Sequence, residues 1–171
     1  LYHATNGASW TGHLSNFGWL SGPPCEGRVA NWAGVDCSFG DGGVHGLSLH
    51  ANGLAGTLPT QVGLLTALIS LGFGSNALSG TLPSEMGALP YLNKAYLGSN
   101  RLSGSVPLEL TNANRLVELL LPDNRISGTL PPMAPRGVPA RRPERDLMES
   151  LVVSRNRLSG TLPEEIGGLG V

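Results

Sequence analysis

Large apolar residues recur along the chain in a pattern that repeats about every 24 residues. In one clear copy, Leu71 and Phe73 are two residues apart and Asn76 follows them; Leu78, Leu82, Met86, Leu89 and Leu92 complete the set. The two-residue spacing places Leu71 and Phe73 on one face of a short strand. The later apolar residues continue an inward-facing set around the turns. A period of this length predicts a solenoid, in which each repeat forms one coil that stacks on its neighbours.

An asparagine marks each coil, at positions Asn52, Asn76, Asn100, Asn124 and Asn156. The intervals between these asparagines are 24, 24, 24 and 32 residues. We number the coils one to five by them. We expect the side-chain amides to form a structural ladder that satisfies backbone groups where the chain leaves the strand. The Gly-Thr-Leu-Pro stretch that follows, which is Gly-Ser-Val-Pro in coil three, is expected to be a second short strand. The other inward strand pairs are Leu47/Leu49, Ala95/Leu97, Leu119/Leu121 and Leu151/Val153.

Residues 1–45 carry no repeat, yet they contain all three tryptophans and both cysteines. The first coil of a solenoid has no upstream neighbour, so its apolar end needs a lid. We therefore divide the chain into an N-terminal cap, 1–45, and a repeat array, 46–171. Within the cap, the run from Leu1 to Trp10 is predicted to be a short helix that ends at Asn6-Gly7.

The cap has a specific pattern: Trp19, Pro24-Cys25, and then Trp32-Ala33-Gly34-Val35-Asp36-Cys37. Followed by these repeats, it resembles the cap of plant-type leucine-rich-repeat proteins. That group includes receptor-like kinase ectodomains and secreted polygalacturonase inhibitors. The resemblance implies an α/β solenoid, a right-handed superhelix of about five 24-residue coils, behind a cap with a Cys25–Cys37 disulfide. Two free buried thiols are the alternative; a metal site is disfavoured because the chain has no Cys-x-x-Cys and its histidines are scattered.

Coil four departs from the period. Between Pro131 and Met148 there are sixteen residues, 132–147, where the regular coil has eight, 84–91. This segment contains four prolines and four arginines, and the spacing of the prolines excludes a helix and predicts an extended loop. We interpret it as a tolerated or erroneous insertion, and alternatively as a basic docking or cleavage loop.

Composition and motifs argue against chemistry. The formal net charge of −1 offers nothing that would recruit nucleic acid or an anionic membrane. The most apolar stretch, 62–74, is too short to span a bilayer, so no direct membrane insertion by this segment is expected. No serine has a nearby His/Asp partner and no ligand cluster has metal spacing. We therefore expect no catalytic residues, no metal and no cofactor; the protein is predicted not to be an enzyme.

What remains is a surface. Residues six, four and two positions before each asparagine alternate outward on the predicted concave sheet, and like positions form rows across the coils. Apart from His50, coils one and two offer small residues there, whereas coils three to five offer an apolar strip edged by charge. An aromatic residue beside arginines is typical of binding hot spots. The alternative is an ordinary surface on which Lys94–Glu118 and Asp123–Arg155 pair between coils. The candidate ligand-binding residues are Lys94, Tyr96, Arg101, Glu118, Leu120, Arg125, Val152, Arg155 and Arg157.

The sequence thus predicts non-catalytic recognition of a protein, peptide or oligosaccharide, extracellular or at the cell surface. The resemblance implies the ligand-sensing ectodomain of a receptor-like protein or kinase. Its alternative is a secreted inhibitor of a wall-degrading enzyme. An intracellular structural scaffold is the third possibility, favoured by the absence of any Asn-x-Ser/Thr glycosylation sequon. Because three arginines occupy one row, we expect mutual repulsion that a ligand with an acidic group would relieve.

Overall fold

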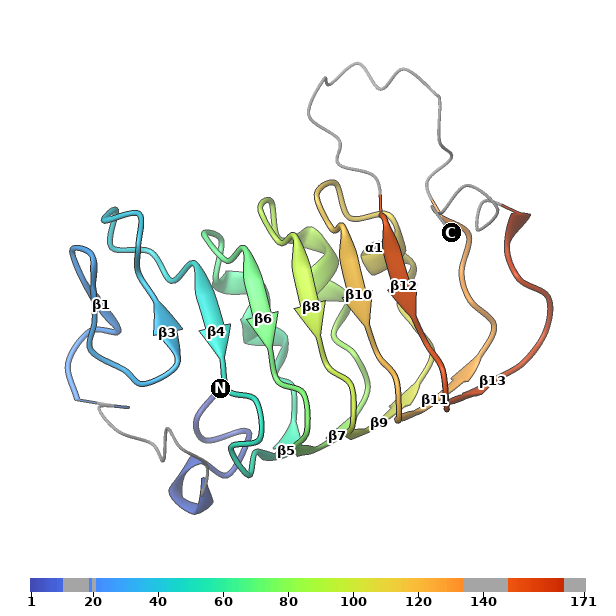
Figure 1. The fold of residues 1–171 in the computed structure, drawn as a ribbon, viewed down its shortest axis with the longest axis horizontal. Coiled ribbons are helices and arrows are strands. Elements are labelled where there is room, and N and C mark those ends of the chain that lie inside the picture. The colour runs from blue at the N-terminus through green and yellow to red at the C-terminus, as the bar shows by residue number, and fades with distance from the viewer. Residues whose placement is uncertain (11–18, 20, 134–147, 165–171) are drawn as a thin grey trace.

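The computed structural model describes residues 1–10, 19, 21–133 and 148–164, and their coils stack side by side (Figure 1). Each coil gives one strand to a six-stranded sheet, the larger sheet, and one to a five-stranded sheet, the smaller sheet. The larger sheet consists of β3 (Val35–Asp36), β4 (Gly46–Ser48), β6 (Ser70–Gly72), β8 (Lys94–Tyr96), β10 (Glu118–Leu120) and β12 (Ser150–Val152). The smaller sheet consists of β5 (Ala55–Thr57), β7 (Ala77–Gly80), β9 (Arg101–Gly104), β11 (Arg125–Gly128) and β13 (Arg157–Leu158).

Short helical turns return the chain from the smaller sheet to the larger one. They are the 3₁₀ helices η2 (Thr60–Leu64) and η3 (Ser84–Ala88) and the α-helix α1 (Leu108–Thr111). In Figure 1 they lie behind the strands of the larger sheet, and the smaller sheet runs along the lower edge. The predicted α/β solenoid is confirmed.

The larger sheet has the register that the repeat predicts. Its coil strands are parallel, and residues 24 apart face each other, as in Ser70↔Lys94↔Glu118. The inward residues are fully buried in coils two to four, from Leu71 and Phe73 to Leu119 and Leu121. In coil five, Leu151 and Val153 are only half-buried.

A left-handed residue turns the chain from the larger sheet to the smaller one. The residue immediately before each asparagine has φ between 49° and 55° although none is glycine: Ala51, Ser75, Ser99, Asp123 and Arg155. Such a conformation is uncommon outside glycine, so it needs support from its surroundings. Its recurrence in every coil makes this corner a fixed element of the repeat.

The asparagine side chains hold the corner together. In coil two, the Asn76 Oδ1 accepts hydrogen bonds from the backbone N–H groups of Asn52 at 3.0 Å and Leu54 at 2.9 Å. Its Nδ2 donates to the carbonyl of Leu49, in the preceding coil, and to that of Phe73, in its own, both at 2.9 Å. Asn100, Asn124 and Asn156 also bond to the preceding coil and to their own. The amides therefore tie each coil to the one before it.

Asn52 departs from the predicted ladder. Its side chain is 1% exposed, and its amide has no hydrogen-bond partner among the described residues. The reason is positional, because the cap precedes coil one where a coil would otherwise supply backbone partners. Asn52 takes part in the ladder through its backbone N–H alone.

The smaller sheet differs from the prediction in two ways. Its strands in coils two to four begin directly after the asparagine, so they precede most of the Gly-Thr-Leu-Pro stretch that we expected to be the strand. The strands are also staggered by two residues per coil: Arg101 faces Ser79, and Arg125 faces Ser103. Like positions of neighbouring coils are therefore diagonal neighbours here, whereas in the larger sheet they are directly opposite.

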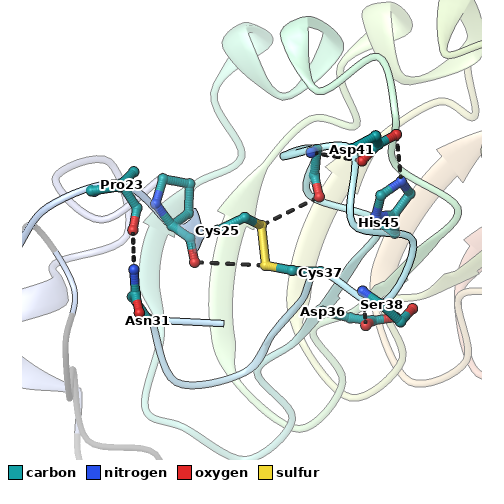
Figure 2. The surroundings of a disulfide bond; sticks show 10 residues. Pro23, Cys25, Asn31, Asp36, Cys37, Ser38, Asp41 and His45 are labelled. Atoms are coloured by element: carbon teal, nitrogen blue, oxygen red, sulfur yellow. Dashed lines mark hydrogen bonds and ion pairs between the residues drawn. A yellow bond between two sulfur atoms is a disulfide. The ribbon is translucent and has the colours of Figure 1, made fainter. Parts of the chain in front are cut away.

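The cap closes the first coil by two routes. At the larger sheet, β3 pairs antiparallel with β4. The strands β1 (Cys25–Glu26) and β2 (Val29–Ala30) form a hairpin, and the Cys25–Cys37 disulfide joins this hairpin to Cys37, the residue after β3 (Figure 2). At the other sheet, the N–H groups of Ala55 and Thr57 donate to the carbonyls of Thr5 and Ala4. The disulfide implied by the family resemblance is thus confirmed.

The predicted helix from Leu1 to Trp10 is wrong. A single turn, closed by the bond from the Thr5 N–H to the Leu1 carbonyl, ends at Asn6, whose φ is 55°. A 3₁₀ turn, η1 (Gly7–Ser9), follows. The buried Trp10 donates from Nε1 to the Thr5 carbonyl at 2.9 Å and contacts Trp19 edge to face. The aromatic residues therefore form the lid that the end of a solenoid requires, and the 1–45 boundary itself stays a prediction.

The predicted insertion, 132–147, lies outside the described residues except for its first two. Met133 is buried, and the Thr111 hydroxyl donates to the Pro132 carbonyl at 2.9 Å. These two residues are thus anchored to the neighbouring coil.

The ladder yields a stability prediction. Asn100→Ala should lower the free energy of unfolding by about 1–3 kcal/mol, because the N–H of Leu78 and the carbonyl of Phe73 lose their partner. Asn52→Ala should cost less, since no side-chain hydrogen bond to a described residue is lost, and exposed Arg101→Ala should cost under about 0.5 kcal/mol. Urea unfolding followed by circular dichroism measures all three, and equal losses for Asn100 and Asn52 would contradict the role assigned to the ladder.

Glycines at different places in the coil should respond differently to a methyl group. A Cβ at Gly87, in η3, would lie 2.3 Å from backbone atoms of Glu109 in the next coil, whereas at Gly72 the nearest atom would be 3.7 Å away. Gly87→Ala should therefore destabilise by about 1–3 kcal/mol and Gly72→Ala by much less. Thermal unfolding of the two variants decides this, and an unchanged melting temperature for Gly87→Ala would refute the close stacking of the turns.

The cap disulfide should contribute measurably to stability. Cys37→Ala should lower the free energy of unfolding by about 2–4 kcal/mol, because the unfolded chain gains the freedom of an opened loop. Denaturant titration measures the loss, and alkylation of the unreduced native protein provides the control. Two thiols that alkylate freely would overturn both the bond and the secretory origin it suggests.

Candidate functional site

The outer face of the larger sheet brings the predicted rows together. The middle row runs Ser48, Gly72, Tyr96, Leu120 and Val152, in direct register across the coils. The side chains thus grow from small in coils one and two to large in coils three to five. Val152 is 36% exposed, and Tyr96 and Leu120 are half-buried. The outer face of the sheet therefore changes from small side chains in coils one and two to an apolar strip, Tyr96, Leu120 and Val152, in coils three to five.

A three-residue polar cluster stands beside the strip. Lys94 and Glu118 face each other on β8 and β10, with the Lys94 Nζ 2.8 Å from the Glu118 Oε1. The Tyr96 hydroxyl donates to the other carboxylate oxygen, Oε2, at 2.5 Å. Both oxygens of Glu118 are therefore occupied, and the aromatic ring of Tyr96 is held by a bond to the neighbouring coil.

Each member of the cluster stabilises the ionisation state of the others. Hydrogen bonds from Lys94 and Tyr96 lower the pKa of Glu118. The hydrogen bond to Glu118 and the negative charge of Glu118 raise the pKa of Lys94. They also raise the pKa of Tyr96, and desolvation of the Tyr96 hydroxyl acts in the same direction. The cluster is thus an ammonium, a carboxylate and a neutral phenol at neutral pH. A carboxylate engaged at both oxygens is a fixed anchor for a ring, and its lowered pKa makes it a weaker base than an ordinary glutamate.

Arg155 also pairs as the sequence suggested. Its Nη1 lies 3.2 Å from the Asp123 Oδ1 in the preceding coil. Both residues are the left-handed corner residues of their coils. Both alternative cross-coil pairs are therefore formed, which accounts for four of the charged side chains in coils three to five.

The three remaining arginines lie elsewhere than predicted. Arg101, Arg125 and Arg157 open β9, β11 and β13, so they belong to the smaller sheet, on the other side of the corner from Tyr96. The left-handed residue before each asparagine redirects the chain before the arginine is reached. The two-residue stagger also places each arginine beside a serine, so the repulsion that we expected from direct stacking is reduced.

Sequence reasoning missed this division because it treated all positions around the asparagine as one surface. The recurrent Asn-Arg pair gave no sign of the corner that precedes it. A hint was available in Ser75, Ser99 and Asp123, since short polar residues adopt the left-handed conformation more readily than most.

Within the described residues, no group of three or more His, Cys, Asp and Glu side chains is placed to hold a metal ion. Across the same part of the chain, no helix has the length and apolar character to cross a membrane. The candidate site therefore consists of the apolar strip and the polar cluster on the outer face of the larger sheet.

Comparisons with known proteins agree with this architecture. Residues 148–169 match the family model Leucine Rich Repeat. A chain of the BIR3–SERK2 complex from Arabidopsis thaliana is 32% identical, with a TM-score of 0.70 over 84% of this chain and 73% of that one. The BIR2 ectodomain from Arabidopsis thaliana is 28% identical, with a TM-score of 0.71 over 94% of this chain and 81% of that one.

A chain from the complex of the Arabidopsis receptor kinase HAESA with the peptide hormone IDA and the co-receptor SERK1 is 29% identical, with a TM-score of 0.61. The alignment covers 72% of this chain and 19% of that one. No curated protein sequence matches significantly. The repeat, its asparagine ladder and these similarities show that the chain belongs to the leucine-rich-repeat family, and that its structural relatives include a plant receptor kinase and a plant ectodomain.

Proposed function

We propose that the chain is the ligand-sensing part of a receptor-like protein or kinase, and that it recognises a protein or peptide without catalysing a reaction. The observation that carries this proposal is the strip of Tyr96, Leu120 and Val152 on the outer face of the larger sheet. Beside it lies the polar cluster in which Glu118 holds the Tyr96 hydroxyl. Its structural relatives support the class of function, since one is a receptor kinase in complex with a peptide hormone and a co-receptor, and another is a two-protein complex.

The arrangement of the strip suits binding in two respects. The bond between the Tyr96 hydroxyl and Glu118 holds the ring before a partner arrives, which reduces the entropy lost on binding. The small side chains at Ser48 and Gly72 leave open space beside the ring; a Cβ at Gly72 would have no atom closer than 3.7 Å. A partner can therefore lie on the outer face of the larger sheet in coils one and two and contact Tyr96.

An extracellular or cell-surface location belongs to the same proposal. The Cys25–Cys37 disulfide supports it, because such bonds form and persist in oxidising compartments. The secreted inhibitor of a wall-degrading enzyme remains the alternative within this compartment.

The proposal is tested by binding to defined partners. Purified BIR3 and SERK2 ectodomains and a panel of secreted plant peptides are passed over the immobilised chain. For any partner bound, Tyr96→Ala should weaken affinity by about 1–2 kcal/mol or more, as expected at a central aromatic contact. Ser70→Ala, in coil two of the same sheet, is the control and should change affinity little.

Three outcomes discriminate between the possibilities. Loss of binding with Tyr96→Ala but not with Ser70→Ala supports the strip. Binding that is unchanged in Tyr96→Ala and in Leu120→Asp rules it out. Inhibition of a fungal polygalacturonase by the chain, without affinity for any ectodomain or peptide, would favour the inhibitor.

A further inference from the structure

The smaller sheet has a charge pattern that the proposed function does not use. Its five strands and the residues that flank them occupy 52–59, 76–83, 100–107, 124–131 and 156–163, and these stretches contain no Asp or Glu. They contain three arginines, Arg101, Arg125 and Arg157, which we name the arginine row. A chain with a net charge of −1 thus presents one surface whose fixed charges are all positive.

The row is free to meet a partner. All three arginines are exposed, and none forms an ion pair with a carboxylate of the described residues. The acid nearest to them in sequence, Asp123, is held by Arg155 at 3.2 Å. The neighbouring serines satisfy backbone groups, since the Ser79 and Ser103 hydroxyls donate to the carbonyls of Gly56 and Gly80. The row therefore offers charge that no described group neutralises.

The stagger of the smaller sheet sets the spacing of the row. Arg125 faces Ser103, and Arg157 faces Ser127, so each arginine is displaced by two residues from the one before it. Neighbouring strands lie about 4.8 Å apart and two residues span about 6.6 Å along a strand, so successive arginines lie about 8 Å apart. In an extended peptide, side chains that share one face recur every second residue, about 6.6 Å apart. The two repeats are close enough for flexible arginine side chains to follow an extended chain.

We propose that the arginine row binds an extended acidic segment of a partner protein in which Asp or Glu occupies every second position. Three carboxylates on one face of the segment would each meet one guanidinium, which can bind a carboxylate through two hydrogen bonds. The intervening residues would face away from the row. This surface lies on a different sheet from the Tyr96 strip, so it can exist whether or not the proposed function is correct.

The test uses two fluorescein-labelled peptides of identical composition and charge. In the first, Gly-Ser-Glu-Ser-Glu-Ser-Glu-Ser-Gly, the acids alternate; in the second, Gly-Ser-Ser-Glu-Glu-Glu-Ser-Ser-Gly, they are consecutive. Both carry the fluorescein on the N-terminal amine and an amide at the C-terminus. Fluorescence anisotropy at low salt should show that the alternating peptide binds at least about threefold more tightly. Added salt should weaken binding, because exposed charges are screened.

Matched variants locate the contact. Arg125→Gln should reduce affinity for the alternating peptide about two- to fivefold, the range of exposed ion pairs, and replacement of all three arginines should abolish binding. Arg115→Gln removes the same charge from a residue whose guanidinium lies over the Tyr91 ring, outside the smaller sheet, and should leave affinity unchanged. Tyr96→Ala should also leave it unchanged, which separates this surface from the strip.

Each contrary result overturns the proposal. Equal affinity for the two peptides would show that charge alone, without spacing, is recognised. An equal loss in Arg115→Gln would show non-specific attraction, and no binding at low salt would remove the site. Tighter binding of an oligogalacturonic acid of three sugars, lost in the same triple variant, would assign the row to an acidic saccharide.

Discussion

The structure depends on how the backbone is satisfied at the corner between the two sheets. Strands of three residues cannot pair all of their N–H and C=O groups, and the left-handed residue at the corner directs several of these groups into the interior. Unpaired buried backbone groups cost as much as lost hydrogen bonds. The amides of Asn76, Asn100 and Asn124 meet this requirement by donating and accepting at once, to the preceding coil and to their own. A leucine in this position would fill the space and leave those groups unpaired.

The same corner decides which surfaces the protein can present. It separates two sheets with different registers, direct in the larger and staggered by two residues in the smaller. Direct register brings Lys94 opposite Glu118, so their charges cancel and the carboxylate can hold the Tyr96 ring. Stagger keeps arginines of successive coils diagonal to one another, so three positive charges are tolerated without neutralisation. One repeated sequence thus yields a neutral apolar face and a cationic face.

The cap shows what happens where the repeat begins. Coil one has no preceding coil to offer backbone partners, and the buried side-chain amide of Asn52 accordingly finds no hydrogen-bond partner in the part of the chain that the structure describes. Closure instead comes from Ala4 and Thr5, which accept hydrogen bonds from β5, and from β3, which extends the larger sheet in the antiparallel sense. The disulfide holds the hairpin against the end of that strand within the cap, and the pairing of β3 with β4 joins the cap to the first coil.

The sequence by itself determined the solenoid, the buried residues and the rows of the larger sheet. These follow from side-chain period and from the 24-residue repeat, and each coil specifies them locally. It also determined which asparagines form the ladder, because an amide that recurs at the same position of every coil can hydrogen-bond the same backbone groups in each. Only the tertiary structure decided that Arg101, Arg125 and Arg157 lie on a different sheet from Tyr96, and that the side-chain amide of Asn52 has no hydrogen-bond partner among the described residues. The first depends on a left-handed turn and a stagger between coils, and the second on what precedes coil one; neither is encoded in the period of a single repeat.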